Sequence, residues 1–183
     1  AFAHASSGGL YGGGIQPIDE TAPLAIAGRL KHYLSTKRAA ELLADAYDGH
    51  FSVCALRYFF IYGAGQKPHM LMPRLAASVR EGRALTLQGS DGMRMNPVHV
   101  ADAAAATVAA LKTSARGVVN IAGPETVSIR DIGTILGRAL GRAPVFETTA
   151  GAPSDLVADI ANMRATLGAP KITPESGLAD ALR

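Results

Sequence analysis

The segment FSVCALRYFFIYG, residues 51–63, constrains the fold of this chain more than any other feature. It is a long apolar run rich in aromatic and β-branched residues, and Gly63, Gly65 and Pro68 end it. A strand that is apolar along its whole length is typical of a parallel sheet covered on both faces. We therefore expect a buried, parallel strand here.

Helical and extended patterns alternate around this run. Asp102 and the Ser128–Asp131 pair stand where helix caps are expected. The alternation of strands and helices predicts an α/β fold. The expected helices are 28–47, 73–82, 102–112, 128–140 and 159–168, and the expected short strands are 1–5, 84–89, 117–123 and 143–149.

Composition excludes several classes of function. The chain has 183 residues, of which 48% are hydrophobic and 18% charged, enough for a real core in one domain, or in one domain plus a small appendage. The net charge of +3 suits an anionic small molecule, but no basic run with interleaved aromatic residues predicts nucleic-acid binding. Cys54 is the only cysteine, and the five histidines are scattered, so we expect neither a disulfide nor a metal site. No apolar run predicts a membrane span or a signal peptide, and a cytoplasmic location is expected.

The segment HYLSTK, residues 32–37, places Tyr33 four residues before Lys37 in a predicted helix. The two side chains then project from the same face, one turn apart. An ammonium group at this spacing favours the tyrosinate form, so the phenol can act as a general base or acid. Ser6 and Ser7 follow a predicted strand and can supply a hydroxyl that holds a substrate oxygen. Taken alone, such a pair more often marks two residues on a helix surface than a site.

Five segments in order strengthen the catalytic interpretation: SSGGLYG, the Tyr33–Lys37 pair, LRYFFIYGAGQ, MLMPRL and VHVAD. From residue 1 to about 170 the chain resembles the extended short-chain dehydrogenase/reductases, in particular the NAD-dependent epimerase/dehydratase group that acts on nucleotide sugars. The resemblance implies the C-terminal part of a Rossmann-type doubly wound sheet plus a small α/β substrate-binding lobe. Residues 1–66 would be the remainder of the catalytic domain, and 67–183 mainly the substrate lobe, with a return to the sheet near 96–123.

The same resemblance implies roles for individual residues. Ser7, four residues before Tyr11, would be catalytic together with Tyr33 and Lys37. Tyr33 and Lys37 would also hold the nicotinamide ribose of NAD or NADP, and Phe59 would border the nicotinamide. The substrate would be a nucleotide sugar or a related small molecule. The implied substrate contacts are Ser7, Gly8, Leu71, Gln88, Arg94 and Asn96.

The chain also departs from the family pattern. Phe60 stands where the family usually has Asn, and Met95-Asn96 where it has Arg-Asp, with Arg94 one residue early. Related dehydratases carry acidic residues where this chain has Gly8 and Gly9. These glycines argue for simple oxidation or epimerisation rather than elimination.

The turn that binds the cofactor pyrophosphate is not evident in this sequence. The segment GGLYGGG is glycine-rich, but it follows the catalytic strand and lacks the expected order of glycines. In the family the dinucleotide-binding half precedes this segment, so either the chain is a fragment or that half lies elsewhere. We expect the edge strand 1–5 to be covered by a missing segment or by a partner. The resemblance also implies a possible homodimer through the helix carrying Tyr33 and Lys37.

Three functional hypotheses remain open. The first is the catalytic and substrate-binding portion of an NAD(P)-dependent sugar-nucleotide epimerase or dehydrogenase. The second is a catalytically silent fragment or interaction module that lacks cofactor binding. The third is a reductase of a non-nucleotide carbonyl substrate, suggested by Phe60 and Met95.

Overall fold

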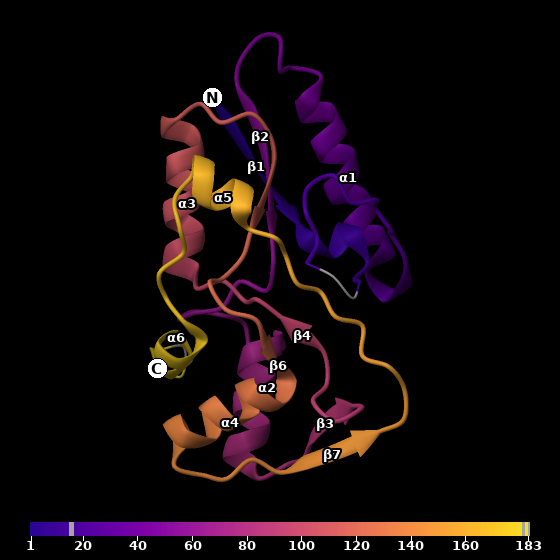
Figure 1. Ribbon diagram of the computed structural model, residues 1–183, viewed down its shortest axis with the longest axis vertical. Helices are drawn as coiled ribbons and strands as arrows, with labels where there is room; N and C mark the ends of the chain where they lie inside the picture. Colours follow the sequence, from indigo (N-terminus) through magenta and orange to yellow (C-terminus); the bar gives the residue numbers. More distant parts are fainter. Residues whose placement is uncertain (15–16, 181, 183) are drawn as a thin grey trace.

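The structure is a computed structural model that describes residues 1–14, 17–180 and 182. It has two parts, one built around a sheet with helices on both sides and a smaller one in which short strands lie beside helices (Figure 1). Two separate clusters of buried hydrophobic side chains form the cores. The smaller part is called the distal lobe below and comprises residues 71–95, 127–149 and 174–180.

Three parallel strands form the central sheet. They are β1 (Phe2–Ser7), β2 (Val53–Tyr58) and β5 (Gly117–Ile121), in the spatial order β1-β2-β5. The middle strand β2 is buried on both of its faces. The predicted buried parallel strand is therefore confirmed, but it ends earlier than the apolar run does. Phe60, two residues beyond the strand, has a φ of 45° and turns the chain away from the sheet.

Helices cover both faces of this sheet (Figure 1). α1 (Lys31–Asp45) lies on one side and α3 (Val100–Lys112) on the other. Successive residues of β2 reach opposite layers, because Arg57 bonds to Glu41 of α1 whereas Tyr58 bonds to a threonine of α3. A parallel sheet needs this two-sided cover, and the α/β prediction is confirmed.

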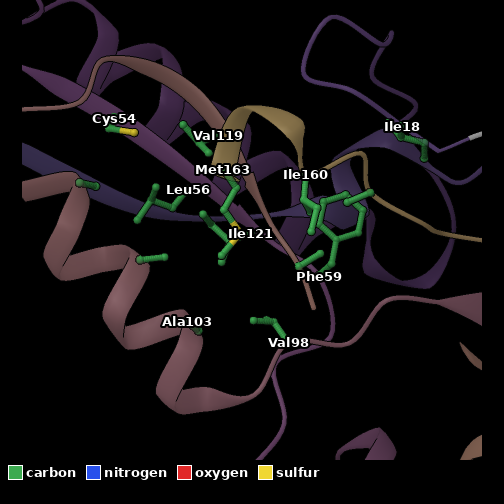
Figure 2. Close-up of a cluster of buried hydrophobic side chains, with 14 of the residues drawn as sticks. Ile18, Cys54, Leu56, Phe59, Val98, Ala103, Val119, Ile121, Ile160 and Met163 are labelled. Atoms are coloured by element: carbon green, nitrogen blue, oxygen red, sulfur yellow. The ribbon is translucent and has the colours of Figure 1, made fainter. Parts of the chain in front are cut away.

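Figure 2 shows the core on the α3 side of the sheet. Leu56 and Ile121 come from the strands, and Met163 comes from the short helix α5 (Ala161–Thr166). The face of α3 that meets them is built from alanines such as Ala103, so the helix can approach the sheet closely. Burial of these apolar side chains is the main force that holds the layers together.

The distal lobe is a small α/β unit with its own core. β3 pairs in parallel with β7, β4 pairs in antiparallel fashion with β6, and α4 packs against α2 and α6. Its elements are α2 (Leu71–Glu81), β3 (Leu85–Gln88), β4 (Arg94–Met95), β6 (Val127–Ser128), α4 (Ile129–Leu140), β7 (Phe146–Thr149) and α6 (Pro174–Asp180).

The chain passes between the two parts more than once. α3 and β5 return to the sheet within residues 96–123, and a second return brings in α5. The second return is anchored by a parallel bridge between Ile18 and Ala158. β2 and β5 each continue into the distal lobe, so the lobe lies beside the carboxyl ends of the strands, where parallel sheets bind ligands.

The capping predictions have mixed outcomes. The capping box of Ser128 and Asp131 at the start of α4 is confirmed. The prediction that Asp102 caps α3 is wrong, because the helix begins earlier and His99 is its N-cap, accepting a hydrogen bond from the amide of Ala101. The carboxylate of Asp102 instead accepts the backbone N–H groups of residues 171 and 172, which ties the C-terminal segment to α3.

Two short 3-10 turns precede α1. They are η1 (Gly8–Tyr11) and η2 (Gly28–Leu30), and the first continues directly from β1. No helix among the described residues is both long and apolar enough to cross a membrane. Across the same residues, no group of three or more His, Cys, Asp or Glu side chains is arranged to hold a metal ion.

Candidate active site

Tyr33 and Lys37 lie on successive turns of α1. The Nζ atom of Lys37 is 5.7 Å from the centroid of the Tyr33 ring and donates a hydrogen bond of 2.7 Å to the carbonyl of Ala5 in β1. Tyr33 itself is 45% exposed. The ammonium group is therefore held against both the strand and the phenol ring.

Ser7 is the last residue of β1 and caps the turn that follows. Its hydroxyl oxygen accepts a 3.2 Å hydrogen bond from the amide of Gly9, which fixes the side chain at the carboxyl end of the strand. Ser7, Tyr33 and Lys37 line one pocket of about 680 Å³. The structure thus brings together the three residues that the family pattern singles out, with a volume typical of small-molecule sites.

The opposite wall of this pocket, called the catalytic pocket below, comes from the end of β2 and the start of α2. Leu71 lines it, as the family resemblance implies for a substrate contact. Met70, the N-cap of α2, makes no side-chain capping bond, and Arg74 in the first turns of α2 also lines the pocket. Backbone N–H groups at a helix start carry partial positive charge, so this wall favours an anion. The other residues of this wall are Tyr58, Phe60, Ile61, Gln66, His69 and Met72.

Phe60 lines the catalytic pocket in an unusual backbone conformation. Its φ of 45° lies in the left-handed region, which Asn tolerates far better than Phe does. The family resemblance implies Asn at this position, a residue that suits this backbone conformation better than Phe does. The result is an apolar ring where an amide would otherwise face the pocket, and a strained residue at a candidate site.

Phe59, the neighbouring residue, points the other way. It is 1% exposed, belongs to the core of Figure 2 and stacks on Tyr11 with ring centroids 6.1 Å apart. Its ring also fills the space beside Gly8, where an added Cβ would lie 2.4 Å from a ring carbon. Phe59 and Gly8 do not line the catalytic pocket, so the roles expected for them in cofactor and substrate contact have no support in this geometry.

The remaining predicted substrate contacts lie elsewhere. The guanidinium of Arg94 pairs with Asp155 at 2.7 Å, and Gln88 is an exposed residue of β3. Asn96 is 3% exposed, and its amide bonds to the backbone N–H and C=O of Ala158, each at 2.9 Å. Asn96 therefore has a structural role, because the N–H and the oxygen of its side-chain amide both bind the backbone of Ala158 in the segment that returns to the sheet.

A buried ion pair behind the pocket was not identified from the sequence. Arg57 donates to both carboxylate oxygens of Glu41, at 2.9 and 2.8 Å, and Ser6 donates to the same carboxylate at 2.5 Å. Burial alone would raise the pKa of Glu41, but the hydrogen bonds from Arg57 and Ser6 hold it below its usual value. The signal in the sequence is an arginine within an apolar strand, which requires a buried partner.

The hydrogen bonds continue from Arg57 toward β5. Arg57 donates to the hydroxyl of Tyr11 at 2.7 Å, and Tyr11 donates to the side chain of Asn120 at 2.9 Å. Burial raises the pKa of Tyr11, with Arg57 opposing the shift, so this phenol stays protonated and can donate. The chain of polar groups links α1 to all three strands.

The chain is similar to several known proteins. The model of the NAD dependent epimerase/dehydratase family matches residues 1–122. A UDP-glucuronate 4-epimerase from Thermodesulfobacterium geofontis is 29% identical over 181 residues, which are 95% of this chain and 55% of that protein. A dTDP-4-dehydro-6-deoxy-D-allose reductase from a Streptomyces species is 27% identical over 82% of this chain and 49% of its own length.

Solved structures agree with the sequence relatives. UDP-glucuronic acid 4-epimerase from Bacillus cereus, in complex with NAD, superposes with a TM-score of 0.84 at 30% identity and is matched over 98% of this chain and 59% of its own. dTDP-glucose 4,6-dehydratase from Bacillus anthracis, also in complex with NAD, gives 0.82 at 25% identity, again over 98% and 59%. The chain therefore spans between 49% and 59% of the length of these relatives.

Proposed function

The chain belongs to the NAD-dependent epimerase/dehydratase family, and from that premise we propose that it carries the proton-transfer and substrate-binding portion of a sugar-nucleotide epimerase or dehydrogenase. The observation that carries the proposal is the catalytic pocket itself. Ser7 from β1 and the Tyr33–Lys37 pair from α1 line it together with the start of α2. Relatives at similar identity include both epimerases and reductases of nucleotide sugars by name.

The residues present fit the nicotinamide ribose of NAD or NADP. The catalytic pocket has a volume of about 680 Å³, and the Lys37 ammonium is fixed at its wall by the carbonyl of Ala5. Tyr33 and Lys37 would hold the ribose hydroxyls through hydrogen bonds. When bound, the cofactor would accept a hydride from a sugar carbon and return it.

The chain's own residues would move the proton. With its phenol oxygen deprotonated, Tyr33 takes the proton from the sugar hydroxyl as a general base, and the neutral phenol so formed gives the proton back as a general acid. The Lys37 ammonium stabilises the negative charge that this oxygen carries before it takes the proton. Ser7 donates a hydrogen bond to the same sugar oxygen and so orients it toward Tyr33.

The wall formed by α2 supports an anionic substrate. Its first backbone N–H groups and the guanidinium of Arg74 would contact the diphosphate of a nucleotide sugar. Gly8 and Gly9 leave no carboxylate after Ser7 for acid–base work at a second carbon. This favours oxidation or epimerisation over elimination.

Calorimetry with NAD, NADP and UDP-glucuronate, followed by product analysis, tests the proposal. We expect saturable binding of the nucleotide sugar and conversion to its epimer or its oxidised sugar. Binding of no dinucleotide and no nucleotide sugar would contradict the proposal and favour the catalytically silent module. Dinucleotide binding in the micromolar range would in turn exclude that module.

One observation favours a second candidate, a reductase of a non-nucleotide carbonyl compound. Phe60, Ile61 and Met70 give the catalytic pocket an apolar side, and Arg94 is held by Asp155 away from it. A panel of nucleotide sugars and simple carbonyl compounds distinguishes the two candidates. Reduction of the simple compounds with no response to any nucleotide sugar would support the second.

A further inference from the structure

Glu41 and Arg57 form an ion pair that is buried between α1 and the central sheet. Their side chains are 3% and 4% exposed, and two parallel hydrogen bonds join them. Exposed ion pairs contribute little to holding backbone elements in place. A buried ion pair whose two partners are fully hydrogen-bonded holds the two elements that carry them in one arrangement. The pair is thus a fixed point between the helix and β2.

The same carboxylate also reaches β1. Ser6 donates to one oxygen of Glu41 at 2.5 Å, and Arg38, one turn earlier in α1, donates to the other at 3.1 Å. Burial favours the neutral carboxyl, but the bonds from Arg57 and Ser6 outweigh it and keep the pKa low. The charged carboxylate therefore joins α1, β1 and β2 at one point.

The carboxylate of Glu41 lies on the same helix as the two residues of α1 that line the catalytic pocket. Tyr33, Lys37 and Glu41 lie on three successive turns of α1. Glu41 is bonded to Ser6 and Lys37 to the carbonyl of Ala5, which are neighbouring residues of β1. Ser7 follows these two residues directly. The bonds Glu41–Ser6 and Lys37–Ala5 fix the position of α1 along β1, and they therefore fix where the turn that carries Tyr33 lies relative to Ser7.

We propose that Glu41 and Arg57 are positioning residues that hold the Tyr33 phenol in register with the Ser7 hydroxyl. The inference rests on the proposed function, because it assigns the pair to the proton-transfer set. Neither residue lines the catalytic pocket, so neither contacts substrate or cofactor. Their effect passes through α1.

Three variants of the full chain test this. Glu41→Met combined with Arg57→Met removes both charges and keeps apolar volume in the layer, which avoids an unpaired buried charge. Ser6→Ala keeps the ion pair and removes the link from Glu41 to β1. Glu175→Gln is the control, because it breaks the exposed pair with Arg138 in the distal lobe.

The first readout is independent of activity. Amide hydrogen exchange is followed in α1 and in α4, together with the carbonyl ¹³C shift of Ala5, which reports the bond from Lys37. In the double variant we expect exchange in α1 to rise about tenfold or more while α4 keeps its rates. The Ala5 shift should change in the double variant, and the control should match the wild type. Ser6→Ala changes the Ala5 shift directly, because residue 6 is bonded to that carbonyl carbon, so exchange in α1 is the readout for this variant.

The second readout separates kcat from KM for a nucleotide sugar. Misplacement of a catalytic group by about 1 Å costs about 10²-fold in rate, so we expect kcat of the double variant to fall by about this factor with KM within about threefold. Ser6 lines the catalytic pocket, so kcat of Ser6→Ala does not test the positioning role and only the double variant is used for this readout.

Several results would overturn the positioning role. Wild-type exchange in α1 of both the double variant and Ser6→Ala, together with a wild-type Ala5 shift in the double variant, would do so. A lower kcat without faster exchange in α1 would also do so, because the effect is inferred to act through the helix. If the wild-type protein, assayed with any residues that precede Ala1, turns over no nucleotide sugar, the proposed function fails, and the exchange and Ala5 shift alone decide the positioning role.

Discussion

The ammonium of Lys37 lies 2.7 Å from the carbonyl of Ala5, two residues before the serine that ends β1. This contact joins the helix that carries the Tyr33–Lys37 pair to the strand that carries Ser7. Neither the Tyr33–Lys37 pair nor the serine at the end of β1 identifies a site by itself. The contact explains how the two segments form one site. It also gives the pair a structural consequence that can be tested separately from catalysis.

Lys37→Met removes both the cation beside Tyr33 and the bond to Ala5. We expect turnover of a nucleotide sugar to fall by about 10²-fold or more, because general acid–base catalysis is lost. The free energy of unfolding should change by less than about 1 kcal/mol, since the bond lies near the surface. Steady-state kinetics and urea unfolding measure the two effects. Lys31→Met at the start of the helix is the control and should leave turnover unchanged.

Glu41→Gln leaves Arg57 charged, buried and with a weaker partner. We expect a loss of roughly 3–5 kcal/mol in the free energy of unfolding at pH 7. The native pKa of Glu41 is lowered, so its stabilisation is present above the unfolded pKa and is lost as pH falls through the native pKa. The difference between wild type and variant should therefore shrink in acid. Denaturant unfolding at pH 7 and at successively lower pH checks this, and a difference that stays constant with pH would contradict it.

Gly8→Ala tests the close approach of Phe59 to the turn after β1. An added Cβ would lie 2.4 to 2.6 Å from three carbons of the ring, so we expect a loss of about 1–3 kcal/mol from overpacking. Gly9→Ala is a matched control, because its Cβ meets the flexible end of Leu34 at 3.1 Å. Phe59→Leu should recover part of the loss when combined with Gly8→Ala. Additive effects of the two substitutions in thermal unfolding would contradict the contact.

Phe60→Asn restores an amide at a left-handed position of the catalytic pocket wall. If the substrate is a nucleotide sugar, one added hydrogen bond is worth roughly 0.5–1.5 kcal/mol, about 2- to 10-fold in Kd. Calorimetry with UDP-glucuronate measures the change, and Phe60→Leu serves as the control without an amide. Weaker binding in Phe60→Asn than in the wild type would favour the reductase of simple carbonyl compounds.

The sequence predicts the central strand well because the signal is local. Both faces of β2 are buried, and a strand buried on both faces needs apolar residues at nearly every position, as the run 51–63 has. The capping box of Ser128 and Asp131 is predictable for the same reason, since all of its atoms lie within one turn.

The sequence does not predict contacts that join distant segments. Asn96 uses its amide on Ala158, which lies 62 residues later, and no local pattern announces that partner. The adjacent residues Phe59 and Phe60 separate into core and pocket wall because β2 has ended at Tyr58 and the chain turns at Phe60. The backbone turn at Phe60, with its φ of 45°, determines which of the two rings enters the core. The aromatic composition of the segment does not predict that turn.

Turnover of a nucleotide sugar by Tyr33→Phe, compared with the wild type, tests the central claim most directly. The assay should use the chain together with any residues that precede Ala1 in the natural protein, with NAD and UDP-glucuronate supplied. Because the phenol oxygen is the proposed proton carrier, we predict that kcat falls by about 10²- to 10⁴-fold while the substitution leaves the fold and nucleotide-sugar binding intact. Full turnover by Tyr33→Phe would contradict the account.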